Sequence, residues 1–315
     1  MKIHALCIAK NEIDIIEQTL VKAINWCDFI YFFDNGSIDG TWERVLDLAK
    51  KNKQIIPYKQ EDCPFSDTLR SQIFNQYRAN CSEGDWWCRL DADEIYIDNP
   101  SEFIAKIDMN CNVITSATFH YYFTDRDLVL YEQDPSLYAD DVPVENKCKY
   151  YLNNWSEIRL FKYSKNLIWQ SDREWPSGLT GDACPVRIRL KNFQYRSPQQ
   201  IQKRIETRRE AVYRGLFPHE SQLDWKKMVF NNDLAPYNVD SKNVDLQTWK
   251  DRIIEASSLN FDAHDGNYVL RNDLMPNLFI MSLIWDYNLT VKNLHKRLFK
   301  KISNVIKDIL KSRND

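Results

Sequence analysis

The sequence lacks several features that mark common classes of protein. Only 7 of its 315 residues are glycine, and no glycine-rich, basic phosphate loop lies near the N-terminus, which argues against the nucleotidyltransferases that carry one. The longest apolar run, at 278–285, is too short to span a bilayer, and the first residues reach charge too soon for a signal peptide. The net charge of −3 gives no reason to expect nucleic acid as a partner. The sequence therefore indicates a cytoplasmic protein that is soluble or peripheral.

The eight cysteines show neither a CxxC pair nor the spacing of a metal site. Several, such as Cys7 and Cys88, lie in apolar runs. Buried free thiols are common in proteins of reducing compartments, whereas disulfides are rare there. The pattern therefore predicts free, buried thiols rather than disulfides.

The residues that are present support a sizeable core, because 43% are hydrophobic and 13% aromatic. The length suggests one large domain, or a domain with an appendage. Apolar runs rich in strand formers alternate with runs of helical periodicity, which predicts an α/β fold with a mostly parallel, doubly wound sheet. The expected strands cover 3–9, 29–34, 54–58 and 86–90, and the expected helices cover 12–26, 37–51 and 66–80.

The later part of the chain is aromatic and strand-like first, then helical. Ser197 and Pro198 are typical of the residues that begin a helix. The expected strands cover 113–123, 157–163 and 166–170, the expected helices cover 197–216, 273–287 and 290–313, and 218–275 is irregular.

Polar residues follow three of the expected strands directly. They are Lys10-Asn11-Glu12, Asp34-Asn35-Gly36 and Asp91-Ala92-Asp93-Glu94. Ligands of open parallel sheets bind in the crevice at the carboxyl ends of the strands. We therefore expect these three segments to converge on one ligand site.

Two Asp-x-Asp triplets occur, and their settings differ. Asp91 and Asp93 follow a hydrophobic strand, and residues two apart in extended chain face the same side. Two converging carboxylates suit Mg²⁺ or Mn²⁺ with positions left open for phosphate oxygens. The alternative is a solvated acidic turn. We interpret the second triplet, Asp125-Arg126-Asp127, as an ordinary solvated loop.

Four segments in this order resemble the family 2 glycosyltransferases of GT-A fold. They are CIAKNEIDIIEQTL, IYFFDNGSIDGTWE, FSDTLRSQIFNQ and GDWWCRLDADE. The resemblance covers roughly residues 1–200 and implies a nucleotide-sugar-binding, catalytic domain there, followed by a helical or irregular region over 201–315. Separately, FQYRSPQQIQKRIETRR resembles a segment found after the core in a bacterial subgroup that acts mostly on cell-surface saccharides.

The resemblance implies roles for individual residues. Asp34 would accept a hydrogen bond from the base or ribose, and Asp93 would hold a divalent metal, Mn²⁺ or Mg²⁺, against the diphosphate. Asp91 would contact the ribose, the metal or metal-bound water. Arg70 would neutralise the acidic cluster, unless it is only a surface helix arginine. The expected nucleotide-sugar-binding residues are Ala9, Asn11, Glu12, Asp34, Arg70 and Asp91.

An inverting transfer also needs a carboxylate base, and the resemblance implies that this base lies downstream of the metal motif. Glu174 is the first candidate and Asp172 the second, with Asp182 nearby. Glu174 could instead be a turn residue paired with Arg173. Trp175 could stack on an acceptor sugar or belong to the core.

The chain departs from the family at the position expected for a third metal ligand. Family members often have a histidine there, whereas this chain has Asn192, with Gln194 nearby. His120 and His264 are possible replacements, or structural residues. Metal affinity is therefore expected to be low unless another side chain replaces the histidine.

The last expected helix has an apolar face and a basic face. Residues 291–313 carry eight basic residues and one acidic residue. Such a helix suits an anionic membrane surface, although it could equally pack on the core with its basic face in solvent.

Together, the sequence predicts a metal-dependent, inverting glycosyltransferase. Its donor would be a UDP-, GDP- or dTDP-sugar and its acceptor a saccharide or lipid-linked glycan. The alternatives are a nucleotidyltransferase and a catalytically weak or inactive protein that binds saccharide or nucleotide.

Overall fold

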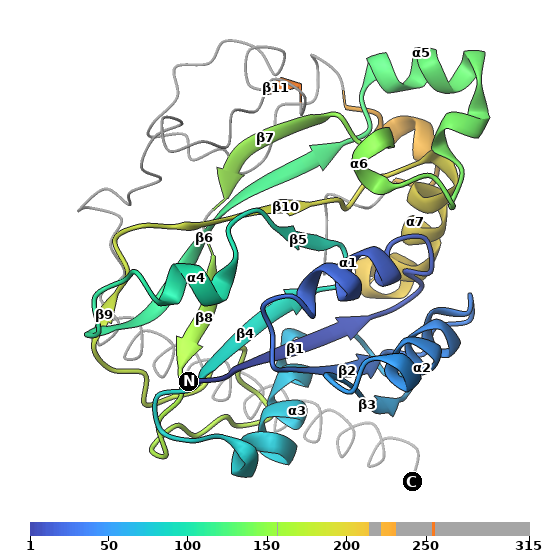
Figure 1. The fold of residues 1–315 in the computed structure, drawn as a ribbon. Helices are drawn as coiled ribbons and strands as arrows, with labels where there is room; N and C mark the ends of the chain where they lie inside the picture. The colour runs from blue at the N-terminus through green and yellow to red at the C-terminus, as the bar shows by residue number, and fades with distance from the viewer. Residues whose placement is uncertain (156, 214–221, 231–253, 256–315) are drawn as a thin grey trace, which may run out of the picture.

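The parallel half of the sheet is formed by the first four strands of the chain. The computed structural model describes residues 1–155, 157–213, 222–230 and 254–255. Within them, the strands lie in the order β3-β2-β1-β4 and all run parallel (Figure 1). They are β1 (Ile3–Ala9), β2 (Phe29–Asp34), β3 (Ile55–Gln60) and β4 (Trp86–Asp91). This confirms the predicted doubly wound α/β arrangement.

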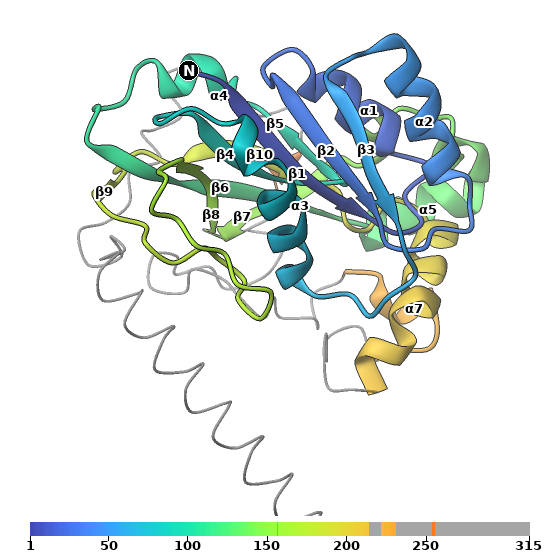
Figure 2. The same cartoon turned by 90° about the horizontal axis from the view of Figure 1, so that it is seen from below.

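Helices cover both faces of these strands. Helices α1 (Ile16–Ala23) and α2 (Thr41–Lys51) lie on one face and α3 (Arg70–Tyr77) on the other, as Figure 2 shows. Strand β1 is buried along its whole length. Cys7 faces the α1 and α2 layer, whereas Leu6 faces the α3 layer. Burial on both faces explains why β1 is apolar throughout instead of alternating.

The other half of the sheet is mixed. Strand β8 (Ile158–Lys162) is antiparallel to both β4 and β6 and joins the two halves. The full order is β11-β7-β6-β8-β4-β1-β2-β3. A side branch is formed by β10, which runs parallel to β6 and antiparallel to β5. The added strands are β5 (Glu94–Tyr96), β6 (Cys111–Tyr122), β7 (Tyr150–Trp155), β9 (Asp182–Ala183), β10 (Ile188–Asn192) and β11 (Ile254–Glu255).

Helix α7 (Pro198–Tyr213) stands across the carboxyl end of β1 (Figure 1). Ser197 accepts a hydrogen bond from the Gln200 amide at 3.2 Å, as expected of a residue that begins a helix. The predicted domain boundary at residue 200 falls inside this helix. The other helices are α4 (Pro100–Ile104), α5 (Asp125–Gln133) and α6 (Val144–Lys147).

Two local predictions are wrong. Residues 125–127 are not a solvated loop, because they form the first turn of α5 and Asp127 is buried. Residues 166–170 are not a strand: only Ile168 pairs, in an isolated bridge with Ser177. Leu167 and Trp169 instead pack from a loop against the α3 side of the sheet.

All eight cysteines lie in the described part of the chain, and each is free, as predicted. Six of them are buried. The predicted helices at 273–287 and 290–313, and His264, lie outside the described residues. No helix within the described residues is long and apolar enough to cross a membrane.

Candidate active site

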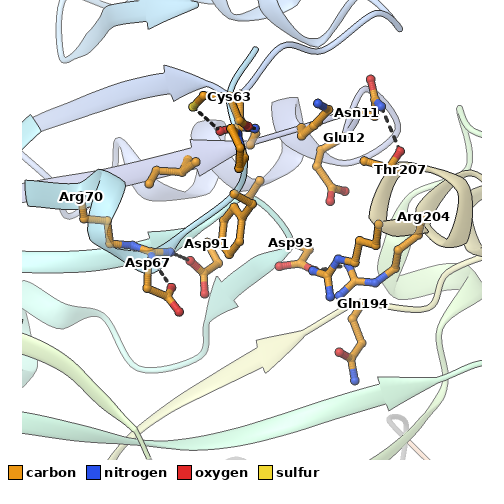
Figure 3. A pocket seen from close by; sticks show the side chains of 18 of the residues that line it. Asn11, Glu12, Cys63, Asp67, Arg70, Asp91, Asp93, Gln194, Arg204 and Thr207 are labelled. Atoms are coloured by element: carbon orange, nitrogen blue, oxygen red, sulfur yellow. Dashed lines mark hydrogen bonds and ion pairs between the residues drawn. The ribbon is translucent and has the colours of Figure 1, made fainter. Parts of the chain in front are cut away.

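A cavity of about 500 Å³ opens at the carboxyl ends of β1 and β4. Its walls are the loops after β1, β2, β3 and β4, together with one face of α7 (Figure 3). The predicted residues Ala9, Asn11, Glu12, Arg70, Asp91 and Asp93 all line it. Other lining residues include Lys10, Asn35, Asp62, Cys63, Phe65, Asp67, Arg89, Asn192, Gln194, Arg204, Thr207 and Arg208.

Asn11 ties three elements together at one wall of the cavity. Its backbone has a φ of 59°, a left-handed conformation that asparagine adopts more readily than most residues. Its amide N–H donates to Ser37 Oγ at 2.8 Å, and its Oδ1 accepts from the Ile38 amide at 2.9 Å. Its Nδ2 donates to Thr207 Oγ1 at 3.1 Å. Asn11 therefore fixes the end of β1 against the loop after β2 and against α7.

Asp34 lies behind the wall instead of lining it. The residue is fully buried, and its Oδ1 accepts from the Ser37 amide at 2.7 Å. Its Oδ2 is buried and has no hydrogen-bond partner among the described residues. The next residue, Asn35, lines the cavity and donates from Nδ2 to the Cys63 carbonyl at 2.7 Å.

Gly36 allows the loop after β3 to close this wall. Its φ is +80°, and a Cβ at this position would lie 2.7 Å from Asp62 Cβ. Both the conformation and the contact require glycine. Asp62 is held on the other side by Lys10, whose Nζ lies 2.8 Å from its Oδ1.

Three arginines surround Asp91. Its Oδ1 accepts a hydrogen bond from Arg70, and its Oδ2 accepts from Arg159 Nη1 at 3.0 Å and from Arg89 Nε at 3.3 Å. The Arg70 and Arg159 side chains are each 3% exposed. Although burial opposes ionisation, the three guanidinium groups hold the pKa of Asp91 well below its usual range. Arg70 is thus a buried partner of Asp91, and the alternative of a surface arginine is wrong.

Glu94, for which no role was predicted, belongs to the same network. Its Oε1 lies 2.6 Å from Arg159 Nη2, and burial raises the pKa of Glu94 to about 8 against the attraction of that arginine. Asp67 and Glu157 also pair with these arginines, at 2.5 Å from Arg70 and 3.1 Å from Arg159. A protonated Glu94 leaves three guanidinium groups facing three carboxylates, which balances the buried charge.

The opposite side of the cavity is anchored by a third buried arginine. Arg196 is fully buried, and it binds Asp14 through Nε and Nη2, both at 2.7 Å, and Glu12 through Nη2 at 2.5 Å. Burial raises the pKa of Glu12 to about 7 against the attraction of Arg196. Since Arg196 lies two residues before the first residue of α7, these bonds fix the start of the helix against the loop after β1.

Helix α7 supplies cavity-lining residues that were not predicted from the sequence. Arg204, Thr207 and Arg208 line the cavity. Arg204 Nη1 lies 3.8 Å from Asp93 Oδ2, and Figure 3 shows the two side chains pointing toward each other. The positions i, i+3 and i+4 fall on one helical face. That spacing was visible in the sequence, but the face that α7 turns toward the sheet was not.

The two candidate bases are not brought to the cavity. Glu174 and Asp172 are exposed and do not line it. Trp175 follows Glu174 directly and stacks on Trp169, with ring centroids 6.3 Å apart. It therefore packs against the core.

His120 lies among buried groups, and burial lowers its pKa to about 4. Neither it nor the exposed carboxylates line the cavity, whereas Gln194 and Asn192 do. Asn192 Nδ2 donates to Glu94 Oε1 at 3.3 Å. Asn192 therefore contacts the Glu94 network. Neither His120 nor Asn192 takes the place of the histidine ligand that the resemblance predicts.

The side chains at the cavity do not fit a divalent metal ion. Both oxygens of Asp91 already bind guanidinium groups, so a cation approaching Asp91 would meet three positive charges. Asp93 also lines the cavity, but in the described part of the chain it is not surrounded by three arginines as Asp91 is. Among the described residues, no three His, Cys, Asp or Glu side chains are placed to hold a metal ion.

Comparisons with known proteins give structural similarity only. No protein-family model matches the chain, and no curated protein matches it. Among solved structures, it is similar to TarS 1–349 of S. aureus in complex with UDP, at 13% identity and a TM-score of 0.28, over 39% of this chain and 36% of TarS. It is also similar to the mannosyltransferase PcManGT of Pyrobaculum calidifontis in complex with GDP-Man and Mn²⁺.

That second similarity has 13% identity and a TM-score of 0.33, over 67% of this chain and 64% of the mannosyltransferase. The chain thus spans about a third of the TarS structure and less than two thirds of the other. One of the two solved structures is a mannosyltransferase. The parallel order β3-β2-β1-β4 is that of a Rossmann-like sheet. We base the functional conclusion on the cavity itself.

Proposed function

We propose that the chain is a glycosyltransferase that moves a sugar from a nucleotide-sugar donor to a saccharide or lipid-linked acceptor. The observation that carries this proposal is the cavity at the carboxyl ends of the parallel strands, where ligands of open α/β sheets bind. Its volume of about 500 Å³ suits a nucleotide sugar. Five basic and five acidic side chains line it, so it can hold both a diphosphate and the hydroxyl groups of sugars.

The nucleoside would lie against the wall formed by the loops after β1, β2 and β3. Ala9, Asn11 and Asn35 line that wall, and the Phe65 ring offers an apolar face to a base. Asp34 lies behind this wall, and its buried Oδ2 lacks a partner among the described residues, so Asp34 would accept from a ribose or base donor only if that donor enters between the wall loops. The diphosphate would then extend toward Asp93 and α7.

The reaction exchanges one bond for another at the anomeric carbon of the donor sugar. The acceptor hydroxyl oxygen forms a bond to that carbon, and the bond from the carbon to the phosphate oxygen breaks. The electron pair leaves with the nucleoside diphosphate, and the hydroxyl proton passes to a carboxylate base. Inversion at the anomeric carbon follows if this exchange is a single displacement, as we propose from the sequence resemblance.

The identity of the base is also a proposal. Glu174 and Asp172 are the candidates from the sequence, and Glu12 is a third candidate because it lines the cavity and its pKa of about 7 suits proton transfer near neutral pH. Transfer assays of Glu174→Gln, Asp172→Asn and Glu12→Gln distinguish them. The base is the residue whose loss lowers transfer by about 100-fold or more, and Glu43→Gln, at an exposed carboxylate that does not line the cavity, serves as the control.

Calorimetry with UDP, GDP and dTDP, each with and without Mn²⁺, tests the proposal first. We expect at least one nucleotide to bind, and no binding under either condition would reject the proposal. A screen of donor hydrolysis over nucleotide sugars follows. Asp93→Ala, which removes a carboxylate from the cavity, should lose the hydrolysis, whereas Asp125→Ala in the other triplet should keep it.

The alternative is a protein that binds nucleotide or saccharide without turnover. Nucleotide binding with no hydrolysis and no transfer across the donor panel would favour it. The peripheral membrane contact through 291–313 is proposed from the sequence, and binding to vesicles with and without anionic lipid tests it.

A further inference from the structure

In the first Asp-x-Asp triplet, arginines bind the Asp91 carboxylate. A metal-dependent transferase needs a free carboxylate there. Asp91 has two oxygens and three guanidinium partners, at 3.0 Å and 3.3 Å for two of them and closer for Arg70. Two of those arginines are almost completely buried. Releasing Asp91 to a cation would leave buried guanidinium charges uncompensated, which is strongly unfavourable.

The cavity has another source of positive charge on its α7 side. Arg204 and Arg208 lie one helical turn apart and both line the cavity. The Arg204 side chain is 11% exposed, and its guanidinium lies over the Tyr195 ring at 5.6 Å from the centroid and 3.8 Å from Asp93. The Arg204 guanidinium therefore lies in the part of the cavity that Asp93 lines.

The helix that carries these arginines is held firmly against the strand ends. The buried Arg196 bonds join its start to Asp14 and Glu12, and the Asn11–Thr207 bond joins its third turn to the end of β1. Guanidinium groups fixed in this way bind phosphate oxygens in a two-pronged geometry at little further entropic cost.

We infer that Arg204 and Arg208 bind the diphosphate of the donor and stabilise its charge as it leaves, and that no divalent metal is needed. This inference rests on the proposed function. As the bond from the sugar to the phosphate oxygen breaks, negative charge gathers on the nucleoside diphosphate, and preorganised cations in the cavity stabilise it. This chain has Asn192 at the position where the family resemblance predicts a histidine ligand, which agrees with this inference.

The test is calorimetry on the full chain after treatment with EDTA, using UDP, GDP and dTDP and their nucleosides as probes. In EDTA the wild-type protein should bind at least one nucleoside diphosphate within about threefold of its affinity in Mn²⁺. Arg204→Gln should weaken that binding by about tenfold or more, as expected for loss of a charge-assisted hydrogen bond, and leave nucleoside binding unchanged. Arg208→Gln is the second variant and should act in the same direction.

Arg209→Gln is the matched control, because Arg209 lies on the same helix, is exposed and does not line the cavity. Nucleotide affinity that depends on Mn²⁺ and is lost in EDTA would overturn the inference and leave the proposed function standing. Wild-type affinity in both Arg204→Gln and Arg208→Gln would overturn it as well. Absence of nucleotide binding under every condition would instead reject the proposed function.

Discussion

The two Asp-x-Asp triplets have the same pattern and opposite surroundings. Asp91 and Asp93 end a parallel strand at the cavity, where Asp91 is bound by three arginines. Asp125 and Asp127 begin α5, and Asp127 is buried. There, Asp127 Oδ2 accepts from the amide and hydroxyl of Thr124 at 2.8 and 2.7 Å and completes a capping box.

The comparison shows that the spacing of two aspartates specifies neither a metal site nor a loop. In the first triplet, the carboxylate balances buried positive charge. In the second, the Asp127 carboxylate accepts from the backbone N–H of Thr124, which has no partner within the helix. The surrounding residues decide which role the carboxylate takes.

The largest expected effect comes from removing Asp91. Asp91→Ala leaves Arg70, Arg89 and Arg159 facing one carboxylate fewer, two of them buried, so we expect the free energy of unfolding to fall by about 3–5 kcal/mol. Asp125→Ala, the matched change in the second triplet, should cost less than about 1 kcal/mol, since it removes one acidic residue from a helix N-terminus. Urea unfolding measures both. Equal losses in the two variants would contradict the arginine network as the source of the difference.

A smaller effect is expected in the second triplet. Asp127→Ala removes the capping box and the acceptor of the Tyr138 hydroxyl, which donates to Oδ1 at 2.8 Å. We expect a loss of about 2 kcal/mol in unfolding free energy and no change in nucleotide affinity. Urea unfolding and calorimetry test the two parts separately. Weaker nucleotide binding in a variant that remains folded would mean that the second triplet also serves the site.

Much of the fold was predictable from local pattern. The strands at 3–9 and 29–34 have the predicted bounds, because each is an apolar run that stops at polar residues. The second triplet was not predicted correctly. Thr124 and Asp127 form a capping box by reaching across one turn, and an acidic residue three positions after a threonine reads equally well as a polar loop.

The site was predictable where it follows strand ends and unpredictable where it depends on tertiary contacts. Ala9, Asn11, Glu12, Asp91 and Asp93 line the cavity because the ends of parallel strands share one edge of the sheet. The partners of Asp91 were not predictable as a set, since Arg159 is brought beside β4 by an antiparallel strand 68 residues away. The face of α7 that lines the cavity was not predictable either, because the contacts of the buried Arg196 with Asp14 and Glu12 orient the helix.

A pH titration sharpens the account of the first triplet. The folded pKa of Glu94 is about 8, above its ordinary value of 4.5, so the folded protein retains a proton that the unfolded chain releases. This contribution to stability is complete below about pH 4.5 and is lost as the pH rises through about 8, at no more than about 1.4 kcal/mol per pH unit. Glu94→Gln cannot ionise, so its unfolding free energy should fall less than that of the wild type between pH 5 and 8. Parallel curves would show that Glu94 is ionised in the folded protein.

The smallest expected effect is from adding the ligand that the family resemblance calls for. Asn192→His places an imidazole at the position expected for a third metal ligand, beside Glu94. If a missing histidine were the only obstacle, this variant should gain Mn²⁺ affinity. We expect no gain in calorimetric titrations with Mn²⁺, because the three guanidinium groups still occupy both oxygens of Asp91 and repel a divalent cation. A rise of about tenfold or more in Mn²⁺ affinity, worth about 1.4 kcal/mol, would show that the arginines yield Asp91 to a metal, and the two triplets would then differ only by one absent ligand.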